Sequence, residues 1–326
     1  MNLAPAAEVK LAEDVLAGKR RALAKAITLV ESSRAADGER VQALLAELLP
    51  HAGKSMRVGI SGVPGVGKSS FIEALGLHLI SLGHRIAVLA VDPSSTLSGG
   101  SILGDKTRME ELSRREQAFI RPSPTGGALG GVAARTREAM LVCEAAGFDV
   151  VIVETVGVGQ SETAVAGMTD VFVLLQLPNA GDELQALKKG IVELADIVVV
   201  NKRDVDAKAA ELACAQLGSA LALLRPASRH WRPPVLSTSA RRGEGIAELW
   251  TAVVDFRAAM QKSGEFEAKR RHQALAWMWT LVEVGLMRRL HEHPALRDRL
   301  PQLTAAVESG SLNPAAAAQE LLNLAN

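Results

Sequence analysis

Short runs of apolar residues, separated by longer segments with helical spacing, fill the middle of the chain. The runs lie at residues 57–61, 85–92, 149–154, 170–177, 196–202 and 233–239. They are apolar nearly throughout, which is typical of strands that are buried on both faces of a parallel sheet. Strands that alternate with helices therefore predict an α/β fold with a doubly wound, mostly parallel sheet.

Both ends of the chain lack such runs. In residues 1–52, apolar and charged positions alternate with helical spacing, and a turn is expected at Asp37 and Gly38. This pattern predicts a helical hairpin, too small to form its own core, that packs on the next domain. Residues 266–326 are helical in pattern to the end. We therefore expect an N-terminal helical extension (1–52), a central domain (53–265) and a C-terminal helical arm (266–326).

The arm carries apolar residues around nearly its whole circumference between Leu275 and Met287. Trp277 and Trp279 are two positions apart, about 200° around a helix, so they cannot share one face. Such a helix is buried on several sides. Because twofold pairing is the commonest form of self-association, the pattern predicts a homodimer built with the arm. The alternative is packing against its own domain alone.

The charge balance narrows the possible partners. The 326 residues include 37 Lys and Arg against 36 Asp and Glu, a formal net charge of +1. This balance argues against nucleic-acid and membrane-surface partners, because proteins that bind them usually carry an excess of Lys and Arg. The sequence shows no signal peptide and no apolar stretch of about 18 residues. Cys143 and Cys214 are far apart and are expected to be reduced and buried. These features predict a cytoplasmic protein.

A glycine-rich segment follows the first apolar run. The sequence GVPGVGKS, residues 62–69, fits the phosphate-binding pattern G-x-x-x-x-G-K-[ST] between a strand and a helix. The glycines allow backbone N–H groups to converge on phosphates, and the helix N-terminus adds partial positive charge. Lys68 is expected to reach the β- and γ-phosphates, and Ser69 to bind Mg²⁺. The predicted phosphate-binding residues are Gly62, Val63, Pro64, Gly65, Val66, Gly67, Lys68, Ser69 and Ser70.

A second motif, N-K-R-D, starts at Asn201 after a later apolar run and fits the guanine-recognition pattern N-K-x-D. The Asp204 carboxylate can accept hydrogen bonds from N1–H and the 2-amino group of guanine, which adenine cannot supply. A site built around such bonds can favour guanine over adenine nucleotides by a factor of about 10⁴ or more. Asn201 is expected to brace the loop and the Lys202 stem to lie over the base. Backbone N–H groups of Ser239 and Ala240 are expected to face the guanine carbonyl.

Two carboxylates at strand ends are candidate Mg²⁺ ligands beside Ser69. Asp92 follows the second run, and Glu154 ends the run at 149–154. Asp105, in the Ser/Gly-rich segment that follows Asp92, is a third candidate. Its alternative roles are a solvated loop acid or a helix N-cap. The predicted metal ligands are Ser69, Asp92, Asp105 and Glu154.

The segment that starts at Glu154 takes the place of the D-x-x-G switch of GTPases, and the Gly157 N–H is expected to face the γ-phosphate. No glutamine directly follows Gly157, so slow intrinsic hydrolysis is expected. The loop 178–190 carries both signs of charge; it fits a partner-sensing loop and a solvated helix start about equally. The predicted catalytic residues are Lys68, Asp92, Asp105, Glu154 and Gly157.

Four segments together resemble one family. GVPGVGKSSFIEALG, AVDPSSTLSGGSILGDKTRM, VIVETVGVGQSE and NKRD occur in the order and spacing of the MeaB/ArgK-type P-loop GTPases. The resemblance covers residues 50–265 strongly and the helical ends more loosely. It implies a GTPase chaperone that associates with adenosylcobalamin-dependent methylmalonyl-CoA mutase, gates cofactor loading, and protects or reactivates the enzyme. It also implies a homodimer.

Two other function classes remain as alternatives. A P-loop kinase would share the phosphate loop, but kinases generally need no guanine-selective carboxylate. A metal-delivery GTPase of the nickel-insertion type would share both motifs. The sequence contains no Cys-x-x-Cys and no His-rich tract that would hold such a metal, and its seven histidines are scattered.

Replacing the base-reading carboxylate tests the guanine assignment. Asp204→Asn should shift preference from guanosine triphosphate towards xanthosine triphosphate, because the 2-carbonyl of xanthine can accept from the new amide. Competition binding with the two nucleotides measures the shift. An unchanged preference for guanosine triphosphate would contradict the role given to Asp204.

Overall fold

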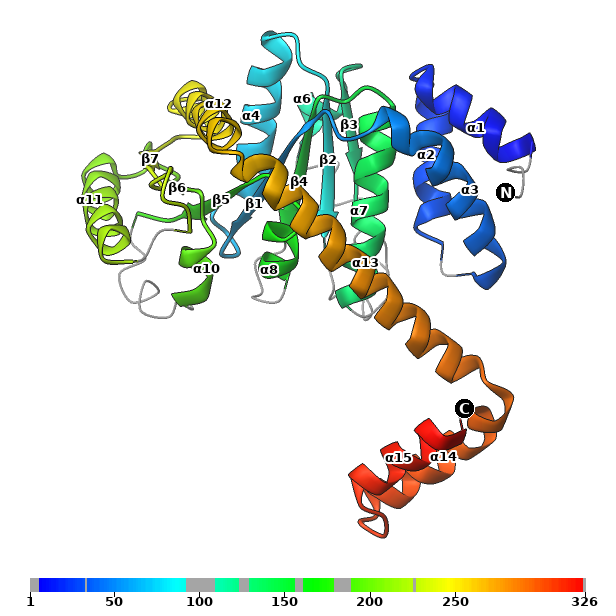
Figure 1. Ribbon diagram of the computed structural model, residues 1–326. Coiled ribbons are helices and arrows are strands. Elements are labelled where there is room, and N and C mark those ends of the chain that lie inside the picture. Colours follow the sequence, from blue (N-terminus) through cyan, green and yellow to red (C-terminus); the bar gives the residue numbers. More distant parts are fainter. Residues whose placement is uncertain are drawn as a thin grey trace. The chain divides into compact units, whose positions relative to one another are not determined.

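A seven-stranded sheet forms the centre of the protein, with helices on both faces (Figure 1). The computed structural model describes residues 6–32, 34–91, 109–122, 129–155, 161–178, 189–224 and 227–324. The strands are β1 (Met56–Gly62), β2 (Ile86–Val91), β3 (Ala118–Arg121), β4 (Val150–Thr155), β5 (Val171–Gln176), β6 (Ile197–Val200) and β7 (Val235–Ser237). Their order is β3-β2-β4-β1-β5-β6-β7, and every neighbouring pair is parallel. The predicted α/β fold is confirmed.

Each of the six predicted runs overlaps one of these strands, but β3 was not expected. It is only four residues long and pairs with β2 alone, at the edge of the sheet. A run as short as AFIR gives little periodicity to distinguish it from a buried turn.

The two faces of the sheet have separate apolar cores. In β4, Val151 and Val153 belong to one core, whereas Val150 and Ile152 belong to the other, as the alternation of side chains along a strand requires. The second core is covered by α4 (Lys68–Ser81), α6 (Glu110–Ser113) and α12 (Ile246–Ser263). The first is covered by α7 (Leu129–Ala145), α8 (Ser161–Ala166), α10 (Lys189–Glu193) and α11 (Ala207–Leu223).

Three helices, rather than the expected hairpin, precede the sheet. Gly18 has a φ of +71°, a left-handed conformation that glycine adopts without strain, and it separates the first two helices. The turn expected at Asp37 and Gly38 is a 3₁₀ turn that leads directly into the third helix. The elements are α1 (Ala6–Leu16), α2 (Arg20–Val30), α3 (Gly38–Leu48) and the 3₁₀ turns Ala35–Asp37 and Leu49–His51.

These N-terminal helices share a core with the sheet domain, as expected for an extension too small to have its own. Ile27 of α2 and Leu44 of α3 are fully buried in the same apolar cluster as Met140 and Cys143 of α7. The extension is therefore an integral part of the domain rather than a separate body.

A buried ionic network ties the segment before β1 to α7. The Glu144 carboxylate, with a side chain only 1% exposed, accepts hydrogen bonds from Arg57 Nε (2.7 Å), Gly53 N (2.7 Å) and Ser55 Oγ. Burial alone would raise the pKa of Glu144, but the Arg57 guanidinium and these other donors hold it below its usual range. Glu144 is thus ionised and paired in the folded protein.

A second part of the network ties α13 (Glu265–Glu292) to the same place. Arg270 donates through Nε to Asp170 Oδ1 (2.8 Å), through Nη2 to Ser55 O (2.7 Å), and through Nη1 to Gly53 O. Asp170 also accepts from Arg57 N (2.8 Å). Side chains from four separate parts of the chain therefore meet at the amino-terminal ends of β1 and β5.

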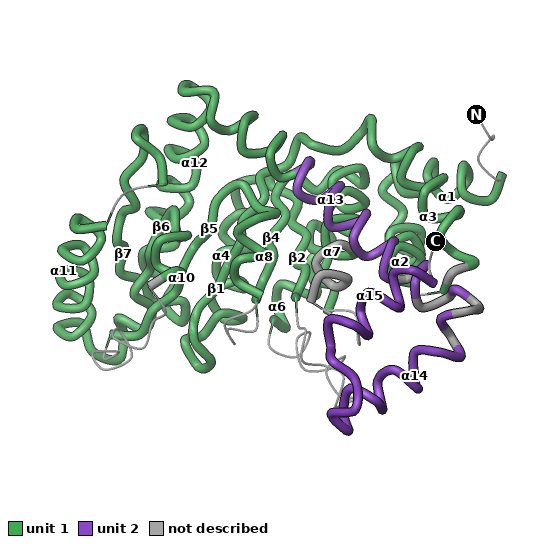
Figure 2. Tube along the Cα trace, turned by 60° about the horizontal axis from the view of Figure 1, so that its bottom comes forward, with its two compact units in different colours: residues 1–273 green, residues 274–326 purple. Residues whose placement is uncertain are grey.

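The chain divides into two compact units, residues 1–273 and 274–326 (Figure 2). The first turns of α13 belong to the first unit and the remainder to the second. In the second unit, α14 (Pro294–Glu308) and α15 (Pro314–Leu324) pack as a hairpin, and Arg299 pairs with Glu320 across it. The three-part division expected from the sequence stays a prediction.

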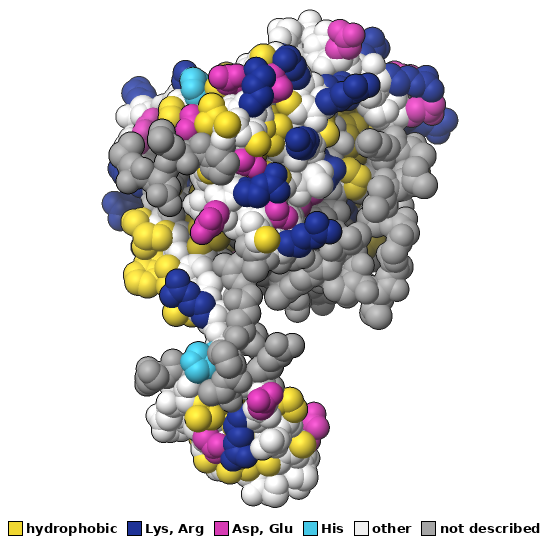
Figure 3. Space-filling model, turned by 90° about the vertical axis from the view of Figure 1, so that its right-hand side faces the viewer, with side chains coloured by type: hydrophobic (Ala, Val, Ile, Leu, Met, Phe, Trp, Pro, Cys, Tyr) yellow, Lys and Arg dark blue, Asp and Glu magenta, His cyan; other side chains and the backbone are white. Residues whose placement is uncertain are grey.

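The surface and the cysteines bear on the earlier expectations. Lys and Arg side chains are interspersed with Asp and Glu on the face that Figure 3 shows, in keeping with the near-neutral net charge. Within the described ranges, no helix is long and apolar enough to cross a membrane. Both cysteines are free; Cys143 is buried as expected, but Cys214 is only half-buried, because α11 packs mainly on β7 at the edge of the sheet.

Breaking the buried network should destabilise the protein. Glu144→Ala leaves the Arg57 charge and the Gly53 N–H without their acceptor, so we expect the free energy of unfolding to fall by about 3–5 kcal/mol. Because the folded pKa of Glu144 is lowered, its stabilisation is present at neutral pH and is lost as the pH falls through the acidic range. Urea unfolding at neutral and acidic pH measures both effects.

Glu110→Ala is the matched control, because Glu110 pairs with Arg114 on the surface, with side chains 66% and 71% exposed. A change of about 0–1 kcal/mol is expected there. Equal effects of the two substitutions would contradict the importance of the buried network.

Candidate nucleotide-binding site

The loop between β1 and α4 depends on three glycines. A Cβ atom at Gly62 would lie 2.6 Å from Leu175 O of the neighbouring strand, so no larger residue fits without a backbone shift. Gly65 and Gly67 have φ values of +82° and +93°. These left-handed conformations are strained for residues with a side chain. The glycines of the predicted phosphate motif thus give the loop its path.

The loop ends at the N-terminus of α4. The first helical hydrogen bond runs from Phe71 N to Gly67 O (2.9 Å), so the N–H groups of Lys68, Ser69 and Ser70 precede it. Backbone N–H groups at this position have no acceptor within a helix and bind anions well. The start of α4 can therefore donate to phosphate oxygens.

Lys68 is held beside its own loop. Its Nζ donates to Gly62 O (2.8 Å) and Val63 O (3.3 Å). These acceptors are neutral carbonyls. A phosphate oxygen would form a stronger, charge-assisted bond to the same ammonium.

The carboxylate of Glu154 faces the start of α4. Ser69 Oγ lies 3.4 Å from Glu154 Oε1 and donates to it, and Glu154 is buried at the carboxyl end of β4. A hydroxyl and a carboxylate are the hard oxygen ligands that Mg²⁺ prefers, so these two residues fit the metal. The other predicted ligands, Asp92 and Asp105, and the predicted switch residue Gly157 lie outside the described residues.

Asn201 connects the two nucleotide motifs. Its Nδ2 donates to Val66 O in the phosphate loop (2.9 Å), and its Oδ1 accepts from Ala240 N (3.2 Å) and Thr238 Oγ1 (3.3 Å). The residue is 1% exposed. A Cβ atom at Gly67 would lie 3.1 Å from Asn201 Nδ2, so the glycine permits this close contact. One buried amide thus joins three loops.

Lys202 occupies the left-handed region with a φ of +64°, alone among the non-glycine residues that the structure describes. Such a conformation costs about 1–3 kcal/mol and persists where the surroundings hold it. Here two flanking hydrogen bonds hold the turn, from Asn201 N to Gln176 O (2.9 Å) and from Arg203 N to Thr238 O (3.0 Å). The Lys202 side chain lies next to Gly67 of the phosphate loop.

Asp204 is oriented by Ser239, whose Oγ donates to Asp204 Oδ1 (2.6 Å). This hydrogen bond lowers the pKa of Asp204, so the half-buried carboxylate is ionised and can accept from a base. The expected backbone donors have partners within the protein: Ser239 N donates to Glu244 O (3.0 Å) and Ala240 N to Asn201 Oδ1. A bond from Ala240 N to guanine would therefore need an exchange of acceptors.

The structure brings the phosphate loop, Glu154 and the N-K-R-D loop to one edge of the sheet, where β1, β4 and β6 end. Sequence reasoning missed the side chains of Thr238 and Ser239, which fix Asn201 and Asp204. The sequence predicts a role only for the backbone N–H groups of Ser239 and Ala240. Two adjacent hydroxyl residues at a strand end were the available signal.

Removing the Asn201 amide tests the connection between the motifs. Asn201→Ala leaves the buried Val66 O and Ala240 N without their partners, so we expect guanine nucleotide affinity to fall about tenfold or more. Equilibrium binding of GDP and GTP measures the loss. Asn323→Ala makes the same chemical change at an exposed position of α15 and should bind normally. Unchanged affinity of Asn201→Ala in a folded protein would contradict the proposed connection.

Comparison with known proteins gives one consistent family. The family model described as "Methylmalonyl Co-A mutase-associated GTPase MeaB" matches residues 23–295. A probable GTPase of Mycobacterium tuberculosis is 56% identical over 317 residues, covering 97% of this chain and 94% of that protein. GTPase ArgK of Escherichia coli is 46% identical, covering 96% of each chain. The mouse mitochondrial methylmalonic aciduria type A homolog is 50% identical, covering 96% of this chain and 78% of its own length.

A solved structure supports the same assignment. The crystal structure of an LAO/AO transport system kinase superposes with a TM-score of 0.76 at 38% identity and covers 99% of both chains. The resemblance noted in the sequence is thereby confirmed. With its phosphate loop and its N-K-R-D loop at one sheet edge, this chain belongs to the MeaB family of P-loop GTPases.

Proposed function

We propose that this GTPase is a chaperone of adenosylcobalamin-dependent methylmalonyl-CoA mutase, where it gates cofactor loading and protects or reactivates the enzyme. The match to a family described as mutase-associated is the observation that carries this proposal. The relatives named for methylmalonic aciduria, in mouse and in Caenorhabditis elegans, support it. A cytoplasmic location fits the proposal.

The nucleotide is proposed to be held by the residues of the two motifs. The phosphate loop and the first turn of α4 would bind the phosphates, and Asp204 would read the base. Because Asn201 bonds to both Val66 and Ala240, binding of guanine at one loop would stabilise the phosphate loop that it braces. Asn201 would thus couple the base-reading loop to the phosphate loop.

Ser69 and Glu154, with Asp92 and Asp105, are the residues proposed to hold Mg²⁺. When bound, the ion would offset charge on the β- and γ-phosphate oxygens. Lys68 would exchange its carbonyl acceptors for phosphate oxygens, and the Gly157 N–H would donate to the γ-phosphate. Because no glutamine directly follows Gly157, slow hydrolysis that waits for a partner is expected.

A homodimer is also proposed. The described part of α13 beyond residue 273 exposes large apolar side chains, among them Trp279 (60% exposed) and Leu286 (59% exposed). Leu275 and Met287 are exposed to a similar degree. Apolar side chains of this size, repeated along one helix, favour burial against a second protein surface.

GTP hydrolysis by the purified protein, alone and with the adenosylcobalamin-dependent mutase, tests the proposed partner. We expect the mutase to accelerate hydrolysis of GTP but not of ATP, because Asp204 selects guanine. Lys68→Ala is the matched control; without its phosphate contact it should show no acceleration.

Other outcomes of this experiment would favour a different partner or a different class of function. If the mutase did not change the rate of GTP hydrolysis, the assignment as a GTPase would stand, but the mutase would be refuted as its partner. Transfer of phosphate to a small molecule or a protein would support the kinase alternative. Among the described residues, no cluster of three His, Cys, Asp or Glu side chains could hold a metal cargo.

A further inference from the structure

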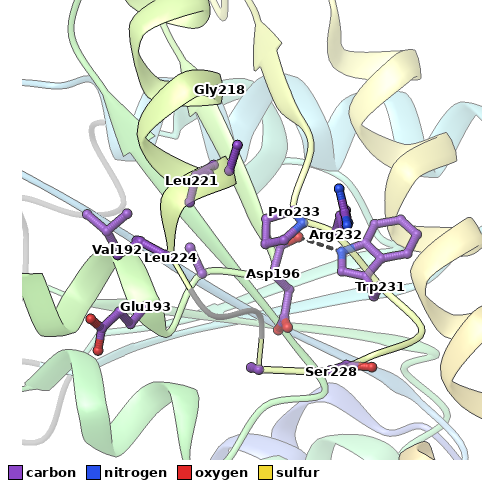
Figure 4. Close-up of a pocket in the computed structure, with 13 residues that line it drawn as sticks. Val192, Glu193, Asp196, Gly218, Leu221, Leu224, Ser228, Trp231, Arg232 and Pro233 are labelled. Carbon is purple, nitrogen blue, oxygen red and sulfur yellow. Dashed lines mark hydrogen bonds between the residues drawn. The ribbon is translucent and has the colours of Figure 1, made fainter.

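A pocket separate from the nucleotide motifs lies on the opposite side of the sheet, where the strands begin. Its volume is about 190 Å³, and it opens between α10, the end of α11 and the loop before β7 (Figure 4). Val192, Leu221, Leu224 and Pro233 form apolar walls, and Asp196 precedes β6 at its base. The phosphate and guanine loops follow the carboxyl ends of their strands, whereas this pocket adjoins the amino-terminal ends of β6 and β7. It is therefore separate from the nucleotide site.

The polar group inside the pocket is the carboxylate of Asp196. Its Oδ2 accepts from Phe172 N (2.9 Å) and lies 3.5 Å from Lys269 Nζ. Its Oδ1 has no hydrogen bond to any described residue, and the side chain keeps 16% of its surface exposed. Burial raises the pKa of Asp196 despite the opposing effect of Lys269, so a further donor would stabilise the ionised form. Oδ1 is thus an acceptor open to the pocket.

The other charged groups around the pocket are of both signs, and Lys269 lies at Oδ2 of Asp196 rather than at Oδ1. Glu193 of α10 lines the pocket, but its carboxylate points away from that of Asp196 (Figure 4). Arg232 also lines the pocket, but its guanidinium points away from the Asp196 carboxylate (Figure 4). Trp231 is fixed by a hydrogen bond from its Nε1 to Asp196 O (2.8 Å). An indole ring in the same pocket as the Asp196 carboxylate is a favourable environment for an organic ammonium group.

Gly218 borders open space on the wall of the pocket formed by α11. It lies inside the helix, where glycine costs about 1 kcal/mol relative to alanine. A Cβ atom at this position would have no other atom within 4 Å, and the backbone conformation does not require glycine. Neither packing nor backbone geometry explains this residue. A larger side chain at position 218 therefore has room to extend into the pocket.

We propose that this pocket is a binding site for a small organic cation, with an ammonium group at Asp196 Oδ1 and a compact apolar body against Leu221, Leu224 and Pro233. The pocket is smaller than the roughly 300–1,000 Å³ of sites for drug-sized ligands, so the ligand has the size of a single ring with a short chain. The inference does not rest on the proposed chaperone function.

Three probes of one shape but different charge test the site. Isothermal titration calorimetry of the full chain is carried out with 2-phenylethylammonium, neutral 2-phenylethanol and anionic phenylacetate. We expect saturable binding of the ammonium probe with an affinity at least about tenfold above that of the other two, because only it forms a charge-assisted bond to Asp196. Equal affinities, or no saturable binding of the ammonium probe, would overturn the proposal.

Two variants locate the binding. Asp196→Asn keeps an acceptor for Phe172 N but removes the charge, so the preference for the ammonium probe should disappear. Gly218→Leu fills the pocket and should abolish binding. Gly285→Leu is the control, because Gly285 also lies inside a helix with no atom within 4 Å of a built Cβ, yet it does not line the pocket.

Normal GTP hydrolysis shows that each variant is folded, since neither Asp196 nor Gly218 belongs to the nucleotide motifs. Undiminished binding by a folded Gly218→Leu variant would place the probe elsewhere and overturn the proposal. Loss of binding in the Gly285→Leu control would do the same.

Discussion

All strands of the sheet run in one direction, and the site depends on this constraint. In a parallel sheet the carboxyl ends of the strands, and the loops that follow them, lie at the same edge. The phosphate loop after β1, Glu154 at the end of β4 and Asn201 after β6 are therefore neighbours, although Gly62 and Asn201 lie 139 positions apart in the sequence. The strands β1, β4 and β6, which carry these residues, are buried almost throughout, and this gives the loops a rigid base.

At this end of the sheet, the Asn201 side chain holds the loops of the nucleotide site together. A buried side-chain amide must satisfy its donors and acceptor, since an unmet polar group in the interior costs about 1–3 kcal/mol. Asn201 meets this requirement with partners from the phosphate loop and from the loop after β7. The base-reading and phosphate-binding parts of the site are consequently held in one arrangement by a residue that need not touch the phosphates.

The sequence predicted most of the sheet because buried parallel strands have a strong signature. The strand β3 escaped because four residues at a sheet edge carry too little pattern, and the third N-terminal helix escaped because Gly18 was not recognised as a break. Motif spacing identified Asn201 and Asp204, but their partners Thr238 and Ser239 depend on a long-range contact between loops. The same applies to Glu144 with Arg57, which lie 87 positions apart and share no local motif.

The network around Arg270 has a consequence for dissecting the protein. Asp170 and the carbonyl groups of Gly53 and Ser55 find their donor in α13, and Gln273 adds a bond from Nε2 to Thr169 O (2.8 Å). A fragment that stopped at residue 265 would keep every nucleotide motif but would lose these donors from the opposite edge of the sheet. The smallest autonomous GTPase fragment therefore extends into the long helix, at least as far as Gln273.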